Sequence, residues 1–145
     1  MMILRSGEIQ ITIPADLRYL NVVGSAVHAY LERTDGVEDE HIEDIVYNIQ
    51  LAVHEVCTNI IEHAYQFDAR KPVQLSFYVS RSENRLEVVL RDQGRKFDPS
   101  AVAAPELGTA QERGLGLFLV YELMDSVDYF HDGIWNRWTL VKKLP

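Results

Sequence analysis

The sequence has little cysteine: a single residue, Cys57, in 145, which excludes an internal disulfide. Structural disulfides are typical of secreted proteins and rare in the cytoplasm, so we expect a cytoplasmic protein. Cys57 stands among apolar residues of an expected helix. This position favours a buried core residue over a reactive nucleophile.

Long hydrophobic runs are also absent. No stretch approaches the roughly 20 apolar residues that span a bilayer, and residues 1–7 lack the architecture of a signal peptide, so we expect no membrane segment. Positive charge is scarce: the sequence has 14 Lys and Arg against 22 Asp and Glu, which gives a net charge of −8. This balance argues against nucleic acid as a direct ligand. It suits a basic protein partner, although an acidic surface also simply keeps a protein soluble.

The histidines lack the spacing of metal ligands. His54-Glu55 begins like a zinc-protease motif, but that motif needs a second histidine four residues after the first, where this sequence has Thr58. His63 lies nine residues from His54, on a different part of the expected helix. We therefore expect no structural zinc.

Apolar residues are plentiful, at 47% of the chain, which is enough for one real core. We find no internal repeat, low-complexity tract or linker, and expect residues 1–145 to form one domain. Residues 8–13 alternate between apolar and polar and predict a strand. Asp16 is a plausible N-cap of the helix that follows. A second helical pattern begins at Asp39 and runs to near Tyr65.

The rest of the chain predicts two strand pairs. Residues 73–79 and 86–90 alternate on either side of a short polar loop, which indicates an antiparallel hairpin. Residues 127–130 and 135–142 predict a closing pair of strands around an Asp-Gly turn.

Polar groups are concentrated in one stretch of the long helix, residues 51–65, which reads LAVHEVCTNIIEHAY. Glu55, Asn59 and His63 recur every four residues, so they share one stripe of a helix. A carboxylate can take a proton from an attacking hydroxyl, and a carboxamide oxygen is a hard ligand for Mg²⁺. In isolation the same pattern also fits solvated helix residues, because short motifs match often by chance.

Two glycine-containing motifs follow. Asp92 and Gly94 end the second strand of the hairpin, where they can form a simple turn. They can also leave a carboxylate facing a pocket beside a glycine that lets a flat ring approach. Residues 95–113 have little periodicity and are long enough for a lid or a disordered loop. Residues 113–117, RGLGL, open an apolar helix whose backbone N–H groups suit phosphates, although G-x-G alone is weak evidence.

The motifs occur in a defined order: Glu55-x-x-x-Asn59, Asp92-x-Gly94, a long loop, and Gly114-x-Gly116-Leu117. The ordered set resembles the GHKL ATPase superfamily, the Bergerat fold shared by gyrase, MutL and histidine kinases. HEVCTNIIEHAY, DQGRKFDP and RGLGLFLVYELMDSVDY are similar to the anti-sigma-factor serine/threonine kinases of bacterial partner-switching systems. The resemblance covers nearly all of residues 8–144.

This resemblance implies an α+β fold, a two-layer α/β sandwich of the Bergerat type. A mostly antiparallel mixed sheet of about five strands would be covered on one face by about three helices. ATP would lie between the long helix, an ATP lid at residues 95–113, and the helix opened by Gly114.

The resemblance also implies roles for individual residues. Asp92 would accept the adenine amino group beside Gly94, Asn59 would hold Mg²⁺, Glu55 would be the general base, and Arg113 would steady the γ-phosphate. The remaining implied nucleotide contacts are His63, Lys96, Gly114, Leu115, Gly116 and Leu117. Lys96 stands where many relatives have a second glycine, and it can restrict the loop or add a phosphate contact.

In the resembled branch the activity is phosphorylation of a serine on a small anti-anti-sigma partner of the STAS type. The same kinase, usually a homodimer, sequesters a sigma factor. The alternative is a nucleotide-dependent regulatory binding module with little or no kinase activity. Glu55 favours the kinase, because a module without catalysis does not need a general base.

Overall fold

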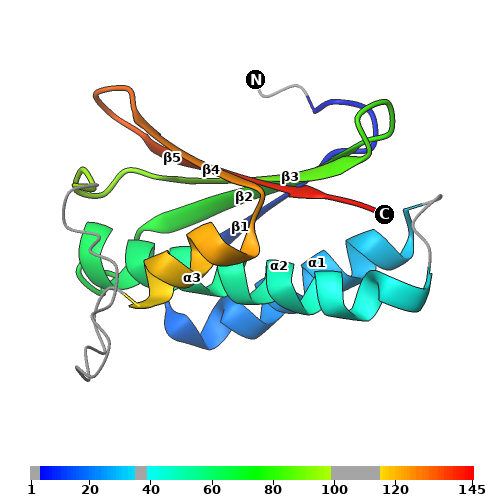
Figure 1. Cartoon of the computed structure of the whole chain (residues 1–145). Helices are drawn as coiled ribbons and strands as arrows, with labels where there is room; N and C mark the ends of the chain where they lie inside the picture. Colours follow the sequence, from blue (N-terminus) through cyan, green and yellow to red (C-terminus); the bar gives the residue numbers. More distant parts are fainter. Residues whose placement is uncertain (1–3, 35–38, 99–114) are drawn as a thin grey trace, which may run out of the picture.

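The computed structural model describes residues 4–34, 39–98 and 115–145, which form two layers. A sheet makes up one layer, and helices α1, α2 and α3 cover one of its faces (Figure 1). The elements are β1 (Ile9–Pro14), a 3₁₀ turn (Leu17–Tyr19), α1 (Leu20–Glu32), α2 (Asp39–Asn59), a π-helical turn (Ile60–Ala64), β2 (Pro72–Ser80), β3 (Arg85–Asp92), α3 (Leu115–Leu123), β4 (Ser126–His131) and β5 (Asn136–Lys143). The predicted α+β sandwich is confirmed.

The five strands lie in the order β1-β2-β3-β5-β4, and each neighbouring pair is antiparallel. The insertion of β5 between β3 and β4 has a consequence for the site. It places the first residue of β5, Asn136, directly opposite the last residue of β3, Asp92. Two side chains that are 44 positions apart in the chain therefore meet at one end of the sheet.

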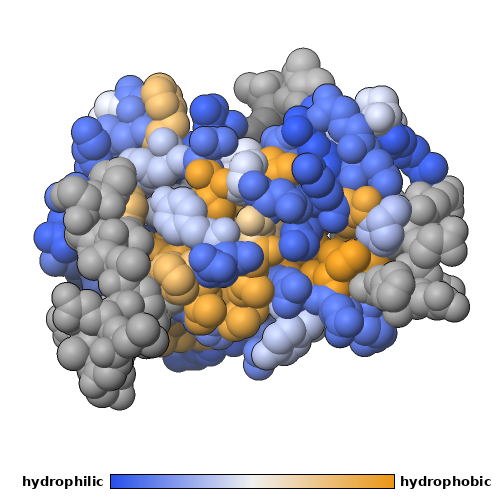
Figure 2. All heavy atoms as spheres, viewed as in Figure 1, coloured by the Kyte–Doolittle hydropathy of each residue, from blue (hydrophilic) through white to orange (hydrophobic). Residues whose placement is uncertain are grey.

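The apolar side chains of both layers meet in one core. In α1 they recur at Leu20, Val23, Val27 and Leu31, the spacing of one helix face. The largest fully buried side chains include Trp138, Phe77, Leu31, Ile49, Ile60, Ile61, Leu75, Leu86, Leu90 and Leu140. Figure 2 shows apolar side chains gathered over α3 between polar ones. Among the described helices, none has both the length and the apolar composition that a membrane crossing requires.

Cys57 lies in this core with no exposed surface, as the sequence predicted. Burial disfavours the charged thiolate and raises the pKa of Cys57 to about 12. The thiol therefore stays neutral and serves as a small apolar side chain.

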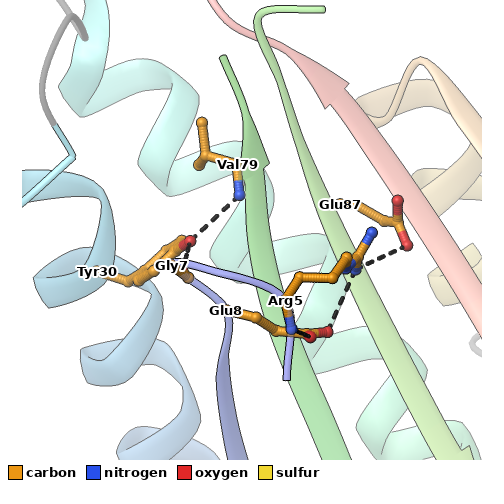
Figure 3. Close-up of polar contacts among 6 residues, drawn as sticks. All are labelled: Arg5, Gly7, Glu8, Tyr30, Val79 and Glu87. Atoms are coloured by element: carbon orange, nitrogen blue, oxygen red, sulfur yellow. Dashed lines mark hydrogen bonds and ion pairs between the residues drawn. The ribbon is translucent and has the colours of Figure 1, made fainter. Parts of the chain in front are cut away.

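The predicted cap, Asp16, begins a 3₁₀ turn rather than α1 itself, whose N-cap position is occupied by Tyr19. Asp16 Oδ1 accepts a hydrogen bond of 3.0 Å from the Arg18 N–H and starts the 3₁₀ turn that leads into α1. The far end of α1 is tied to the sheet by Tyr30, whose hydroxyl donates to the Gly7 carbonyl and accepts from the Val79 N–H (Figure 3).

Polar contacts also fix the start of the chain against the sheet (Figure 3). The Arg5 guanidinium lies 3.2 Å from a Glu8 carboxylate oxygen and 3.4 Å from one of Glu87. These two contacts connect the residues before β1 with β3, two strands away in the sheet.

The predicted long helix reaches Ala64, but its last turn is widened. Residues Ile60–Ala64 form a π-helical turn, in which the Tyr65 N–H donates to the Ile60 carbonyl at 2.9 Å. The buried Tyr65 then closes the helix, because its hydroxyl donates to the Pro72 carbonyl and accepts from the Gln93 N–H, both at 2.7 Å. Such π turns are rare and frequently lie at functional sites.

Candidate functional site

Two adjoining hollows open at the end of the sheet where α2 turns into the π-helical segment. The first, of about 440 Å³, is lined by Asn59, Ile60, His63, Ala64, Asp92, Arg95, Lys96, Phe97, Asp98, Leu117, Tyr129, Asn136 and Trp138. The second, of about 690 Å³, is lined by Glu55, Thr58, Asn59, Glu62, His63, Gln66, Phe67, Arg95, Gly116 and Leu117. They share Asn59, His63, Arg95 and Leu117, so one extended ligand can occupy both.

Asp92 is the buried acid of the first hollow, with 1% of its surface exposed. Its Oδ1 accepts from the Gly94 N–H at 2.8 Å and from the Asn136 amide at 2.9 Å. Its Oδ2 is buried and has no hydrogen-bond partner among the described residues. A buried acceptor without a partner is costly and rare in folded proteins. A ligand that places an N–H group here would satisfy it.

The surroundings of Asp92 act on its titration in opposite directions. Burial is the largest effect and raises the pKa of Asp92, while the hydrogen bonds from Asn136 and Gly94 and the neighbouring His131 act to lower it. Burial prevails, and the pKa lies above its ordinary value. A further donor or a positive charge at the carboxylate would act against burial and lower the pKa of Asp92.

Asn136 is a site residue that the sequence reasoning missed. Its Nδ2 donates to Asp92 Oδ1 and also lies 3.1 Å from the carbonyl oxygens of Gly94 and Arg95. Its Oδ1 accepts from the Tyr129 hydroxyl. An asparagine at a strand start normally indicates only a turn. Asn136 is identified by its position opposite Asp92 in the register of β5 against β3. The sequence alone does not contain this register.

Three aromatic side chains from three different segments also line the first hollow. The ring centroids of Phe97 and Trp138 are 4.9 Å apart, as are those of Tyr129 and Trp138. The Phe97 N–H donates to the Tyr129 hydroxyl at 2.8 Å and so joins the segment after β3 to β4. Flat aromatic walls beside a buried acceptor suit a nucleobase, which combines a stacking face with polar edges.

Glu55, Asn59 and His63 all line the second hollow, which confirms that they share one side of the helix. Glu55 is half-buried and lies against Gly116. The contact is so close that a Cβ atom on Gly116 would overlap the Glu55 Oε2 atom. The glycine thus lets α3 approach the carboxylate without an intervening side chain. His63 is largely exposed, and its ring lies 4.0 Å from the Glu62 carboxylate.

The chain is similar to known proteins over most of its length. Residues 13–142 match the family model described as histidine kinase-like ATPase domain. The chain is 36% identical over 132 residues to the serine-protein kinase RsbW of Halalkalibacterium halodurans, covering 86% of this chain and 76% of that protein. It is 31% identical over 137 residues to the serine-protein kinase RsbW of Bacillus cereus strain AH187, covering 88% and 80%.

The chain belongs to the histidine kinase-like ATPase family, in the branch of the RsbW serine-protein kinases. The solved structure of the RsbU and RsbW domains of Rv1364c from Mycobacterium tuberculosis shares the fold. Its TM-score is 0.67 at 17% identity, over 94% of this chain and 32% of that one. The histidine kinase domain of the blue-light activated kinase of Erythrobacter litoralis aligns at 23% identity with a TM-score of 0.56, over 91% of this chain and 62% of that one.

Within this family fold, Gly94 also has a packing role. A Cβ atom there would fall well inside van der Waals distance of the Ala64 backbone, and the next N–H group, of Arg95, donates to the Ala64 carbonyl at 2.9 Å. Gly94 thus admits the π-helical turn, and the expected approach of a flat ring beside it stays a prediction. Gly94 is absent from the described lining of both hollows.

The other predicted contact residues divide into three groups. Lys96 lines the first hollow and is exposed, while Leu117 is buried and lines both. Leu115 begins the described part of α3, and only its backbone is described. Arg113, Gly114 and residues 99–112 of the predicted lid lie outside the described residues.

The described residues of the site offer a neutral oxygen donor suited to Mg²⁺. Asn59 borders both hollows and can offer its carboxamide oxygen. Mg²⁺ commonly takes one or two protein ligands and completes its shell with phosphate oxygens and water. In the described ranges, no three acidic, histidine or cysteine side chains lie close enough to hold a metal by themselves. The site therefore fits Mg²⁺ as a companion of a bound phosphate.

Proposed function

We propose that this protein is an ATP-dependent serine/threonine kinase and an anti-sigma factor. It would phosphorylate a serine of a STAS-domain anti-anti-sigma partner in the cytoplasm and, as a homodimer, sequester a sigma factor in the absence of active partner. The observation that carries the nucleotide part is the buried Asp92, whose Oδ2 lacks a hydrogen-bond partner beside aromatic walls.

The first hollow is the proposed adenine site. The 6-amino group of adenine donates to Asp92 Oδ2, while the ring lies against the aromatic walls that include Phe97 and Trp138. Asp92 Oδ1 is already saturated by two donors, so a single acceptor remains for the base. Guanine carries an acceptor at its 6-position, where it would oppose the carboxylate.

The second hollow is the proposed phosphate site. Asn59 borders both hollows and would hold Mg²⁺, which supplies charge neutralisation for the phosphates when bound. Glu55 lines only the second hollow, remote from the base, and takes the proton of the incoming serine hydroxyl as a general base. The N–H groups of Gly114 and Gly116, with Arg113, complete the proposed phosphate contacts.

The relatives support a kinase over a binding module, since they carry the name serine-protein kinase at 31–36% identity over most of this chain. A basic surface on the partner would complement the net charge of −8. The alternative is a binding module without catalysis, which the experiment below distinguishes from a kinase.

The nucleotide assignment is tested with Asp92→Asn. Asparagine keeps the Oδ1 acceptor for Gly94 and Asn136 and replaces Oδ2 with an amino group that cannot accept. Loss of a charge-assisted hydrogen bond costs about 1.5–3 kcal/mol, so Mg-ATP affinity should fall roughly 10–150-fold. Asp128→Asn, an exposed site on β4, is the matched control and should bind normally. Equal affinities of Asp92→Asn and the wild type would refute the assignment.

The kinase assignment is tested by incubating the protein with γ-labelled ATP and candidate STAS proteins, each paired with its serine-to-alanine variant. Label that appears on the serine-containing partner alone supports the kinase. ATP-dependent partner binding without transfer of label would assign the binding module instead.

A further inference from the structure

We propose that Asn136 is a positioning residue that sets selectivity for an amino-bearing purine. By holding Asp92 in one rotamer, it leaves Oδ2 as the single acceptor offered to the base. This inference rests on the proposed function, because it specifies how the adenine site of that function discriminates between bases. It adds a residue whose side chain acts through Asp92 rather than on the nucleotide itself.

The first support is the way Asn136 engages Asp92. Both side chains are 1% exposed, and Asn136 Nδ2 lies 2.9 Å from Asp92 Oδ1. The Gly94 N–H reaches the same oxygen at 2.8 Å. Two donors converging on one oxygen fix the rotation of the carboxylate. A rotation by 180° would only exchange the two equivalent oxygens and leave the same geometry. Tilting the carboxylate out of plane would break both bonds.

The second support is that the orientation of the Asn136 amide is itself determined. Its Nδ2 faces three acceptors, which are Asp92 Oδ1 and the carbonyl oxygens of Gly94 and Arg95. A flipped amide would place its own oxygen against all three. On the other side, Asn136 Oδ1 accepts from the Tyr129 hydroxyl, which is oriented in turn by the Phe97 N–H.

The Oδ1 side has one further neighbour, the His131 ring, whose Nδ1 lies 3.0 Å from Asn136 Oδ1 and donates when that nitrogen carries a proton. Both known neighbours of Oδ1 are therefore groups that can donate, and none forces the amide to flip. A fully satisfied buried amide of this kind rigidifies its surroundings.

The third support is that the same amide holds the wall of the hollow. By accepting from Asn136, the carbonyls of Gly94 and Arg95 keep the segment after β3 against β5. Phe97 follows in that segment and packs on Tyr129 and Trp138 with centroid distances of 5.4 and 4.9 Å. One side chain thus sets both the acceptor for the base edge and the distance to the aromatic surface beside it.

The test compares Mg-ATP with the Mg complex of purine riboside triphosphate, which lacks only the 6-amino group. The wild type should prefer ATP by about 10–150-fold, the range expected for one charge-assisted hydrogen bond. In Asn136→Ala, only the Gly94 N–H still holds Asp92 Oδ1, so the carboxylate can turn about that bond and the preference should fall below about threefold. A general loosening of the fold would weaken both nucleotides alike and leave their ratio unchanged.

Asn84→Ala is the matched control. The Asn84 amide also donates to two carbonyls, of Leu144 and Pro145, but it lies at the other end of β3, roughly 26 Å away along the strand at 3.3 Å per residue. The variant should lose stability yet keep the wild-type nucleotide ratio.

Tyr129→Phe is the second variant, in case Asn136→Ala does not fold. It retains the packed ring, removes the donor to Asn136 Oδ1, and should reduce the ratio at least threefold. If a folded Asn136→Ala protein keeps the wild-type ratio of the two nucleotide affinities, the proposed role of Asn136 is wrong while the proposed function stands. If Asn136→Ala does not fold, the same outcome in Tyr129→Phe decides. Absence of ATP binding by the wild type would overturn the proposed function instead.

Discussion

At the scale of single residues, the candidate site places the carboxylates of Asp92 and Glu55 in different surroundings. Asp92 is buried, and one of its oxygens is without a partner. Glu55 is half-buried and lies against a glycine of α3 at the edge of the second hollow. The first is suited to recognition, because a buried acceptor discriminates strongly between ligands. The second can reach an incoming hydroxyl, which is what proton transfer requires.

Glu55→Gln separates binding from chemistry. Glutamine keeps the size and polarity of the side chain but cannot take a proton, so phosphate transfer should fall by about 10²–10⁴-fold while ATP affinity stays within error. Glu43→Gln, at an exposed position of α2, should transfer phosphate normally. Phosphorylation time courses beside ATP titrations decide the matter, and an unimpaired Glu55→Gln enzyme would remove Glu55 from the mechanism.

At the scale of elements, one hydroxyl group bonds to two strands at the junction between α2 and the sheet. Tyr65 follows the π-helical turn and bonds to the first residue of β2 and to Gln93, directly after β3. The junction therefore holds the helix that carries Glu55 and Asn59 in a fixed place relative to the strand that carries Asp92.

Tyr65→Phe should destabilise the protein by roughly 1–3 kcal/mol, because it removes two part-buried hydrogen bonds, to the Pro72 carbonyl and from the Gln93 N–H, each worth about 0.5–1.5 kcal/mol. The matched control is Tyr47→Phe, since Tyr47 lies on α2 with 64% of its surface exposed, and its stability should be unchanged. Urea unfolding of both variants measures the difference. Equal midpoints would show that water replaces the Tyr65 hydroxyl without cost.

Most elements could be predicted from the sequence, because their signals are local. Alternating apolar residues such as Val73, Leu75 and Phe77 face the core of an actual strand, and the four-residue spacing of Glu55, Asn59 and His63 does place them beside the same hollow. The π-helical turn could not be predicted, since apolar residues at its start fit an α-helix equally well. The turn adjoins tertiary contacts that local sequence does not contain, among them the hydrogen bonds of Tyr65 with Pro72 and Gln93.

The missed parts of the site are those that depend on strand register. Asn136 has meaning only opposite Asp92, and the aromatic wall arises when Phe97, Tyr129 and Trp138 come together from separate segments. The contact of Gly94 with the Ala64 backbone likewise depends on how the π-helical turn packs beside the end of β3, which the motif alone does not contain. Motifs thus identify which residues to examine, while their partners follow from the pairing of distant strands.

At the scale of the whole molecule, Asp92 should make folding stability depend on pH. Its pKa is raised in the folded state, chiefly by burial, above the ordinary value of 3.8. At pH values between the unfolded-state pKa of Asp92 and its raised folded-state pKa, the folded state binds more protons than the unfolded state. The free energy of unfolding therefore falls as pH rises through this window. Above the window the penalty for burying the charge is complete.

The difference in unfolding free energy between the wild type and Asp92→Asn isolates this effect from other carboxyls. As pH rises from below 3.8, the wild type should lose stability relative to Asp92→Asn, and the difference should then level off. Urea unfolding at a series of pH values measures it. A difference that is constant with pH, or one that moves towards the wild type, would contradict the raised pKa.

The buried Cys57 has a consequence for following the molecule in solution. A neutral thiol without exposed surface can react with a disulfide reagent only after the core opens, so its rate of labelling reports that opening directly. Because the chain has no other cysteine, one introduced on the surface would react first and alone. The native sequence therefore accepts a single spectroscopic probe at a chosen position without any prior substitution.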